Sequence, residues 1–141
     1  MENNFKLKIK LDEGALKPVR GHATDAGLDL KSPVDAWVHP GEHKQIDTKV
    51  RVAIPDGYVG LITSKSGLML QNITSRGTID SSYRGTISAV LFNHGKDGYL
   101  VRAGDKVCQL VILPVVIPEI EYVDELDETE RGEGGFGSTG K

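Results

Sequence analysis

The sequence predicts an all-β protein, organised as a sandwich, a jelly roll or a barrel. Apolar and polar residues alternate with a period of two in several short runs, which is the pattern of half-buried strands. Turn-forming residues, among them 17 glycines and 6 prolines, separate these runs along the chain. Many short strands joined by regular turns are typical of these three architectures.

The first strands are predicted where this alternation is clearest. Between Phe5 and Leu11, apolar residues alternate with three lysines, so this strand would bury one face and expose a lysine face. A second run, at residues 46–54, has an apolar residue or a threonine at every other position. A Pro-Asp-Gly turn at residues 55–57 then ends this run.

The remaining elements are predicted from shorter runs. Strands are expected at residues 58–63, 86–92 and 99–102, which are β-rich and bounded by turn residues. Residues 107–117 are nearly all apolar and predict one or two buried strands. Only residues 66–72 offer a place for a short helix.

Length and composition limit the classes of protein to which this chain can belong. The 141 residues are the size of one domain, and 38% of them are apolar, which excludes wholesale disorder. A net charge of −3 argues against a protein that binds duplex DNA. No apolar run reaches the ~20 residues that span a bilayer, and the N-terminus lacks the apolar segment of a secretory signal. The one cysteine, Cys108, excludes an intrachain disulfide and fits the core of a protein from a reducing compartment. We therefore expect a cytoplasmic protein that binds neither nucleic acid nor membrane.

Charge is unevenly distributed along the chain. Residues 1–118 contain 15 basic and 12 acidic residues, a net charge of +3. Residues 119–133 contain eight acidic residues and one arginine, a net charge of −7. We predict one domain at residues 1–118, followed at residues 119–141 by an acidic connector and a glycine-rich arm that belong to the same domain. The connector is either a solvated surface segment or an arm that holds the tail away from its own body.

Three internal segments carry side chains suited to nucleotide chemistry. Residues 64–67 combine two serines, a lysine and a glycine, which suits phosphate but also a plain helix N-cap with a surface lysine. In residues 77–85 a carboxylate, a phenol and a guanidinium lie beside a tight turn. The carboxylate there is either a general base for water or an ordinary turn aspartate. Asp25 and Asp29 flank Gly27 in an early loop, and hard carboxylates suit Mg²⁺ directly or through water.

The glycine-rich tail has chemistry of its own. Its glycines allow several backbone N–H groups to converge on one anion. Ser138 and Thr139 add hydroxyl donors, and Arg131 adds a bidentate donor for phosphate. Phe136 stands among glycines, where its ring could stack on a base. The alternative is a disordered terminus, which glycine-rich ends commonly are.

In combination, these segments resemble the five motifs of the trimeric dUTPase family, in the family's order. They lie at residues 23–30, 64–68, 77–85, 104–110 and 131–140 and together span most of the chain. The resemblance implies a β jelly roll or distorted β-barrel with a flexible glycine-rich C-terminal arm. It also implies a homotrimer that hydrolyses dUTP to dUMP and pyrophosphate by Mg²⁺-assisted attack of water on the α-phosphate. This reaction removes dUTP and supplies dUMP for thymidylate synthesis.

Two of the motifs are especially specific for this family. The third contains the run Ile-Asp-x-x-Tyr-Arg-Gly, which begins at Ile79. The fifth is the run Arg-Gly-x-Gly-Gly-Phe-Gly-Ser-Thr-Gly, which begins at Arg131. Both runs occur in this chain without interruption.

The resemblance implies roles for single residues. Asp80 would be the general base that orients the attacking water, and Tyr83 would pack under the deoxyribose and leave no room for a 2′-hydroxyl. Asp29 would hold Mg²⁺ through water. The backbone of a narrow hairpin would read uracil and reject bulkier bases. The hairpin residues are Gly77, Thr78 and Ile79. Further substrate contacts are implied for Lys65, Ser66, Gly67, Ser88 and Gln109.

Three chains would build each site of such an enzyme. The first, second and fourth motifs come from one subunit, the third motif from a second subunit, and the tail from the third. The acidic connector would carry the tail to another subunit. There Phe136 would stack on uracil, and other tail residues would hold the γ-phosphate end of the substrate. These are Arg131, Gly137, Ser138 and Thr139.

The chain departs from the family's motifs at four positions. Lys65 replaces the usual arginine of the second motif, so a bidentate phosphate contact becomes a point charge. In the fourth motif, Lys106 and Cys108 replace an arginine and an alanine. Thr74 stands roughly where some members place an asparagine near the uracil.

Two other functions are compatible with this sequence. One is that of the sister dCTP deaminase family, which shares the fold, but the complete tail with Phe136 and the run from Ile79 favour a dUTPase. The other is a regulatory dUTPase of viral or phage type, which binds a protein partner in the host cytoplasm. Assays for pyrophosphate and for ammonia distinguish a dUTPase from a dCTP deaminase. Capture of a protein partner tests the regulatory function.

Overall fold

The computed structural model describes residues 5–140 and confirms the all-β prediction. Within these residues there are eleven strands and one short helix, α1 (Ser66–Met69). Most strands are only three to six residues long, because turns interrupt the alternating pattern so often. The strands are β1 (Lys8–Leu11), β2 (Gly27–Lys31), β3 (Ala36–Val38), β4 (His43–Asp47), β5 (Val50–Ala53), β6 (Tyr58–Thr63), β7 (Ile73–Thr74), β8 (Gly77–Ile79), β9 (Ser88–Asn93), β10 (Tyr99–Val101) and β11 (Lys106–Pro114).

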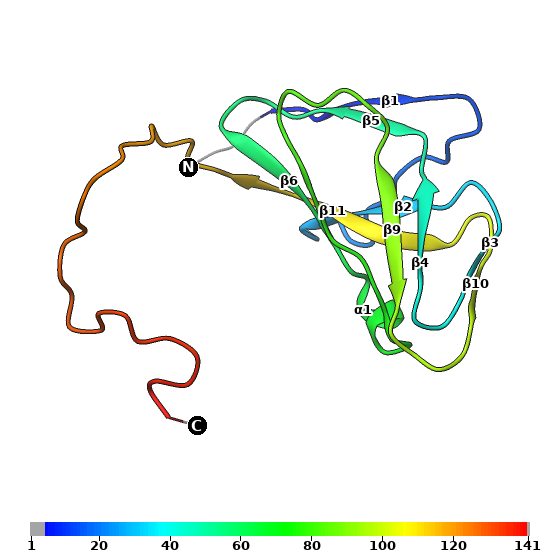
Figure 1. Cartoon of the computed structure of the whole chain (residues 1–141). Helices are drawn as coiled ribbons and strands as arrows, with labels where there is room; N and C mark the ends of the chain where they lie inside the picture. The colour runs from blue at the N-terminus through cyan, green and yellow to red at the C-terminus, as the bar shows by residue number, and fades with distance from the viewer. Residues whose placement is uncertain (1–4, 141) are drawn as a thin grey trace.

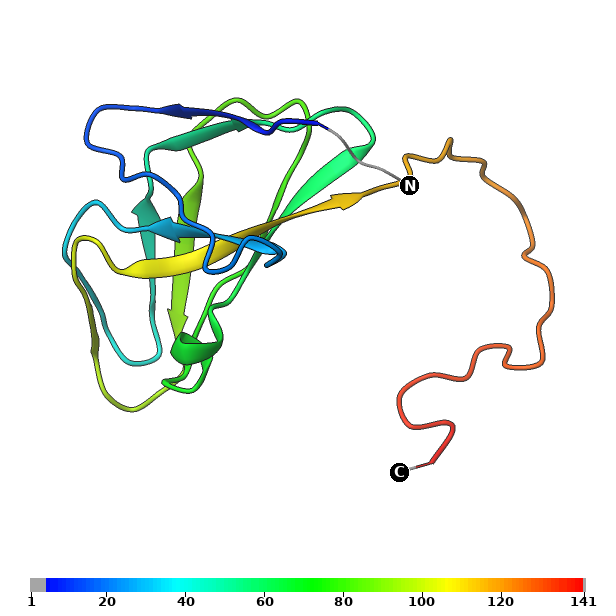
Figure 2. The ribbon, with the colours of Figure 1, turned by 180° about the vertical axis from the view of Figure 1, so that it is seen from behind.

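The strands form four small antiparallel sheets. The largest has the order β2-β11-β6-β8, and a three-stranded sheet has the order β4-β9-β7. Two further sheets are the pairs β1-β5 and β3-β10. Figures 1 and 2 show β11 crossing the body and continuing into a segment that leaves it. Among residues 5–140 the sheets do not close into one barrel, so the arrangement is consistent with a jelly roll rather than with a closed β-barrel.

Alternate residues of these strands bury their side chains in one apolar core. Leu30 of β2, Ile62 of β6 and Leu110 of β11 are buried, and the register places Leu110 opposite Ile62. Burial of each such side chain contributes about 1.5–3 kcal/mol. Cys108 is buried in the same core, as predicted, and its burial raises the pKa of the thiol to about 12.

The predicted strand at residues 46–54 is two strands in two different sheets. Lys49, with a φ of 61°, lies between the end of β4 at Asp47 and the start of β5 at Val50. The side chain of buried Thr48 stabilises this corner, since its Oγ1 donates a hydrogen bond of 2.6 Å to the carbonyl of Ile87. The alternation itself is confirmed, because every second residue from Ile46 to Ile54 is buried.

The observed boundaries of other elements also differ from the predicted ones. The first strand begins at Lys8 instead of Phe5, and the side chain of Ile9 is exposed because β1 pairs only with β5. Residues 107–117 hold one strand, β11, which loses its burial toward its end, where it pairs with β6 but no longer with β2. The helix within residues 66–72 is confirmed but short. The sequence did not indicate β2, β3 or β7, which are short and lack a long alternating run.

After β11 the chain forms an extended arm. Residues 115–140 contain no helix or strand, and at the start of the arm the N–H of Val115 donates a hydrogen bond of 2.9 Å to the carbonyl of Gly57 in the body. Figures 1 and 2 both show the arm standing away from the sheets. Residues 1–4 and 141, the ends of the two predicted parts of the domain, lie outside the described residues. In the described part of the chain, no helix is long and apolar enough to cross a membrane.

Candidate active site

One group of predicted site residues lines a cavity beside β8. The cavity has a volume of about 290 Å³, and β4, β8, β9 and the loop between β8 and β9 contribute to it. Four of the seven lining residues come from the third predicted motif, and Ser88 was predicted with them. The lining residues are Gln45, Thr78, Ile79, Asp80, Tyr83, Thr86 and Ser88.

Asp80 directly follows β8 and is exposed to solvent. The carbonyl of Asp80 accepts a hydrogen bond of 3.1 Å from the N–H of Tyr83, which closes the turn that follows the strand. Within residues 5–140 the carboxylate itself has no hydrogen-bond or ion-pair partner. An exposed carboxylate without a protein partner is free to accept a proton from a bound water.

Tyr83 is held in place at the wall of this cavity. Its phenolic oxygen donates a hydrogen bond of 2.8 Å to the carbonyl of Thr86, and its ring rests against Gly85, where a Cβ would overlap it. The residue remains 44% exposed. A fixed, partly exposed aromatic ring provides a flat surface for a ligand.

Gln45 is a lining residue that the sequence did not indicate. Its Nε2 donates a hydrogen bond of 3.2 Å to Oγ of Ser88, because β4 and β9 are neighbours in the three-stranded sheet. No motif surrounds Gln45, so the sequence could have indicated it only if the pairing of β4 with β9 had been known. Thr74, which stands where some family members place an asparagine, lies on β7, where its Oγ1 forms a hydrogen bond of 2.8 Å with Nε2 of His94.

A second group of predicted residues lies across three neighbouring strands. The register places Asp29, Gln109 and Thr63 side by side on β2, β11 and β6. Asp29 was expected in a loop, and this was wrong, since it lies on β2 and is buried. The side chain of Gln109 lies against Gly27, where a Cβ would overlap it, and its Nε2 donates a hydrogen bond of 3.3 Å to the carbonyl of Ser64.

Asp29 forms ion pairs with lysines from two different motifs. Nζ of Lys65 lies 2.6 Å from its Oδ1, and Nζ of Lys106 lies 3.4 Å from its Oδ2. Lys65 immediately precedes α1, whose Ser66 and Gly67 are exposed to solvent. The structure therefore brings Lys65 and Gln109 together with Asp29, and adds Lys106, for which the resemblance implied no role.

The two groups are separated along β6. Ile79, the residue before Asp80, pairs with Gly60 near the start of β6, whereas Lys65 follows the end of that strand at Thr63. Three residues of a strand span about 10 Å, and Lys65 lies beyond them. One chain thus presents Asp80 and Lys65 at different ends of the same strand.

The tail is joined to neither group. The hydrogen bonds of residues 131–140 run within the arm, among them one of 2.8 Å from Nε of Arg131 to the carbonyl of Gly134. The ring of Phe136 is fully exposed. Gly137, Ser138 and Thr139 are exposed as well. In the single chain, the five predicted tail residues therefore do not meet the rest of the candidate site.

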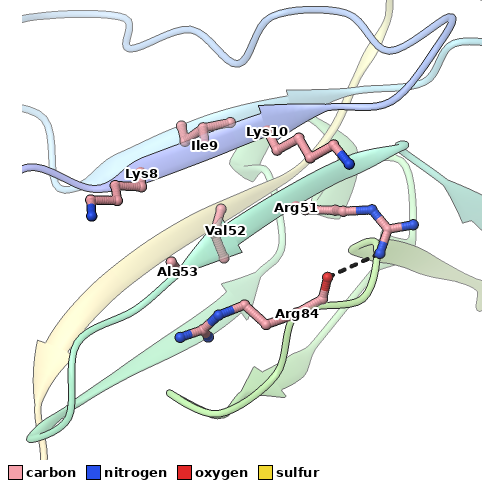
Figure 3. A pocket seen from close by; sticks show the side chains of 7 residues that line it. All are labelled: Lys8, Ile9, Lys10, Arg51, Val52, Ala53 and Arg84. Atoms are coloured by element: carbon pink, nitrogen blue, oxygen red, sulfur yellow. Dashed lines mark hydrogen bonds between the residues drawn. The ribbon is translucent and has the colours of Figure 1, made fainter.

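A basic pocket of about 350 Å³ lies between β1, β5 and the loop after β8 (Figure 3). Nη1 of Arg51 donates a hydrogen bond of 3.0 Å to the carbonyl of Arg84, which links β5 to the loop that carries Asp80 and Tyr83. Arg51 also pairs with Asp12, and this contact lowers the pKa of Asp12 and raises that of Arg51. The basic pocket is lined by Lys8, Ile9, Lys10, Arg51, Val52, Ala53 and Arg84.

Comparisons with known proteins agree on one family. The family model described as dUTPase matches residues 15–140. A deoxyuridine 5'-triphosphate nucleotidohydrolase of Clostridium tetani is 44% identical over 142 residues, which cover 97% of this chain and 98% of the relative. The human mitochondrial protein of the same name is 44% identical over 134 residues, which cover 94% of this chain and 53% of that protein.

Solved structures agree with the sequence comparisons. A dUTPase of Staphylococcus bacteriophage 80alpha, solved with dUpNHpp, superposes with a TM-score of 0.89 at 34% identity and covers 96% of this chain and 99% of its own. That structure is described in terms of phage dUTPases that control the transfer of virulence genes. The relatives named here are dUTPases, which favours that activity over dCTP deamination.

Proposed function

This chain belongs to the dUTPase family, and from its two groups of site residues we infer that it hydrolyses dUTP to dUMP and pyrophosphate. The observation that carries this inference is the cavity beside β8, where Asp80 and Tyr83 lie together with the end of the hairpin strand. A nucleoside with a planar base and a deoxyribose fits a small cavity that has one aromatic wall and one free carboxylate.

Asp80 acts as the general base in this proposal. A water held by the carboxylate attacks the α-phosphorus, and its proton passes to Asp80. The bond between the α-phosphorus and the oxygen that bridges to the β-phosphate breaks, and pyrophosphate leaves. Tyr83 supports the deoxyribose, and the backbone of Gly77, Thr78 and Ile79 offers N–H and C=O groups to uracil.

Asp29, Lys65 and Gln109 form the phosphate end of the proposed site. Among residues 5–140 no three His, Cys, Asp or Glu side chains are grouped to hold a metal ion. Both oxygens of Asp29 already face lysines, which fits contact with Mg²⁺ through water instead of direct coordination. When bound, the ion neutralises charge on the triphosphate. Lys65, Ser66 and Gly67 hold the phosphate oxygens.

We propose that three subunits share each site. This accounts for the separation of Asp80 from Lys65 along β6, and for a tail, residues 131–140, that forms no hydrogen bond with a site residue of its own chain in the described structure. It also accounts for exposed apolar side chains on the arm, which a neighbouring subunit would cover. These include Val116, Ile117, Ile120, Tyr122, Leu126 and Phe136.

The basic pocket offers a place for the connector of a neighbouring subunit. It combines four cationic side chains with an apolar floor, whereas residues 119–133 carry a net charge of −7 and several exposed apolar side chains. Residues 115–131 span up to roughly 55 Å when extended, which is ample to cross between subunits. Because Arg84 belongs to the loop of Asp80, a connector docked there would deliver its tail close to the nucleotide. Light scattering tests the assembly, and the monomer mass together with full activity would contradict it.

The activity itself is tested by substrate comparison. Pyrophosphate release is measured with dUTP, dTTP, dCTP and UTP, and ammonia release is measured in parallel with dCTP. We expect release of pyrophosphate from dUTP to exceed that from the other three nucleotides by orders of magnitude. Equal rates with dTTP, or ammonia from dCTP, would overturn the proposal. The cytoplasm is the proposed location, since the one cysteine is a free, buried thiol that suits a reducing compartment.

A further inference from the structure

The ion pairs of Asp29 join two positions at which this chain departs from the family's motifs. Lys65 belongs to the second motif and Lys106 to the fourth, yet both ammonium groups face the same carboxylate, one at each oxygen. The side chain of Asp29 is only 6% exposed. A buried carboxylate is costly unless cations or hydrogen bonds compensate its charge, and these two lysines supply compensating charge to Asp29.

The two lysines carry more positive charge than is needed to neutralise the single carboxylate of Asp29. The group keeps a net charge of +1, and each ammonium has three N–H donors. Lys65 donates one of them to Asp29, whereas Lys106 is joined to Asp29 by an ion pair alone. The side chains of Lys65 and Lys106 are 27% and 46% exposed, so their remaining donors face solvent. The group can therefore receive an anion from outside while Asp29 stays compensated.

We propose that Lys106 is a positioning residue for the triphosphate, and that it acts through Asp29 on Lys65. This inference rests on the proposed function. When Lys65 turns its donors toward the phosphates, its contact with Asp29 weakens, and Lys106 compensates the buried charge at that moment. Without Lys106, Asp29 would depend on Lys65 alone and would hold it back from the nucleotide.

Lys31 provides a matched control for this proposal. It lies on β2 directly opposite Lys106 in the register of β11 and carries the same charge. The described residues include no ion pair between Lys31 and Asp29. Substitution of Lys31 therefore removes one positive charge at the same end of these two paired strands and leaves both ion pairs of Asp29 in place.

The experiment is a titration of dUpNHpp and dUMP into the full-length protein at one Mg²⁺ concentration. In Lys106→Met, we expect the affinity for dUpNHpp to fall about tenfold, the scale of one charged contact. The affinity for dUMP should fall less, because dUMP carries less charge. Lys106→Arg should restore binding, and Lys31→Met should change it less than about twofold. Lys106→Gln provides the same comparison if Lys106→Met proves unstable in thermal unfolding.

A second pair of variants separates positioning from direct contact. Asp29→Asn has nearly the same shape but needs no cation, so adding Lys106→Met to Asp29→Asn should cause no further loss of dUpNHpp affinity. An equal loss in both backgrounds would mean that Lys106 binds phosphate directly and would overturn the proposal. So would unchanged binding in Lys106→Met, or an equal loss in Lys31→Met. If the wild-type chain binds dUpNHpp but releases no pyrophosphate from dUTP, the proposed function fails while the ion-pair argument is still decided by these affinities.

Discussion

The ring of Tyr83 lies directly against Gly85, so that a Cβ at position 85 would overlap the phenol. The hydrogen bond from the phenolic oxygen of Tyr83 to the carbonyl of Thr86 fixes the ring in this position. The loop therefore positions the ring by two means, the missing side chain of Gly85 and a hydrogen bond from the phenolic oxygen. Tyr83 also lines the cavity that contains Asp80.

Substitution Gly85→Ala should displace this ring. We expect kcat/KM for dUTP to fall and the preference for dUTP over UTP to weaken by about tenfold, the scale of a lost steric discrimination of 1–3 kcal/mol. Steady-state kinetics with both nucleotides measures the change. Ser82→Ala, an exposed position in the same loop, should leave the preference intact. If Gly85→Ala keeps the wild-type preference for dUTP over UTP, the position of the Tyr83 ring does not determine recognition of the sugar.

Substitution Asp80→Asn should remove the general base while it keeps the size of the side chain. We expect kcat to fall by roughly 10²–10⁴-fold, whereas binding of dUpNHpp is retained. Asp56→Asn is the matched control, because Asp56 lies near Asp80 and accepts a hydrogen bond of 3.0 Å from Oγ of Ser81. If Asp56→Asn causes the loss and Asp80→Asn does not, then the base has been assigned to the wrong carboxylate.

Deletion of residues 131–141 should leave the body folded, because the described part of this segment contributes nothing to the core. We expect the loss to fall on kcat at least as much as on KM, since a closing tail excludes water and fixes the phosphates for reaction. Thermal unfolding checks the fold, and steady-state kinetics with dUTP measures the two parameters.

Mixed assemblies test whether the tail acts on another subunit. A chain without residues 131–141 is refolded together with full-length Asp80→Asn, and each variant is also refolded alone. Some mixed trimers would combine an intact Asp80 from one chain with a tail from another, so activity should recover. If mixed trimers are present and no activity returns, the shared site is wrong.

The thiol of Cys108 should be unreactive and should make stability depend on pH. Burial raises its pKa from 9.0 to about 12, and the charge of Asp29 acts in the same direction. The folded state thus retains its proton longer than the unfolded chain does. This contribution to stability is complete below about pH 9 and is lost as pH rises toward 12.

Two measurements check the Cys108 prediction. A thiol reagent at pH 8 should label the folded protein far more slowly than the denatured protein. Between pH 9 and 12, the free energy of unfolding should fall more steeply in the wild type than in Cys108→Ala. Burial also raises the pKa of Tyr99. Because Tyr99 is present in both proteins, its contribution to the free energy of unfolding cancels in this comparison. Equal slopes would show that the thiol does not titrate differently in the two states.

The amino-acid sequence by itself determined the β class, the strand at residues 58–63, the short helix, the burial of Cys108 and the motif residues. These depend on local patterns, since period-two alternation and turn residues act over a few neighbours. Tertiary structure alone decided that residues 46–54 divide at Lys49 and that Gln45 joins Ser88. It also decided that Lys65 and Lys106 meet at Asp29, because residues that lie far apart in sequence become neighbours only through strand register, which no local pattern contains.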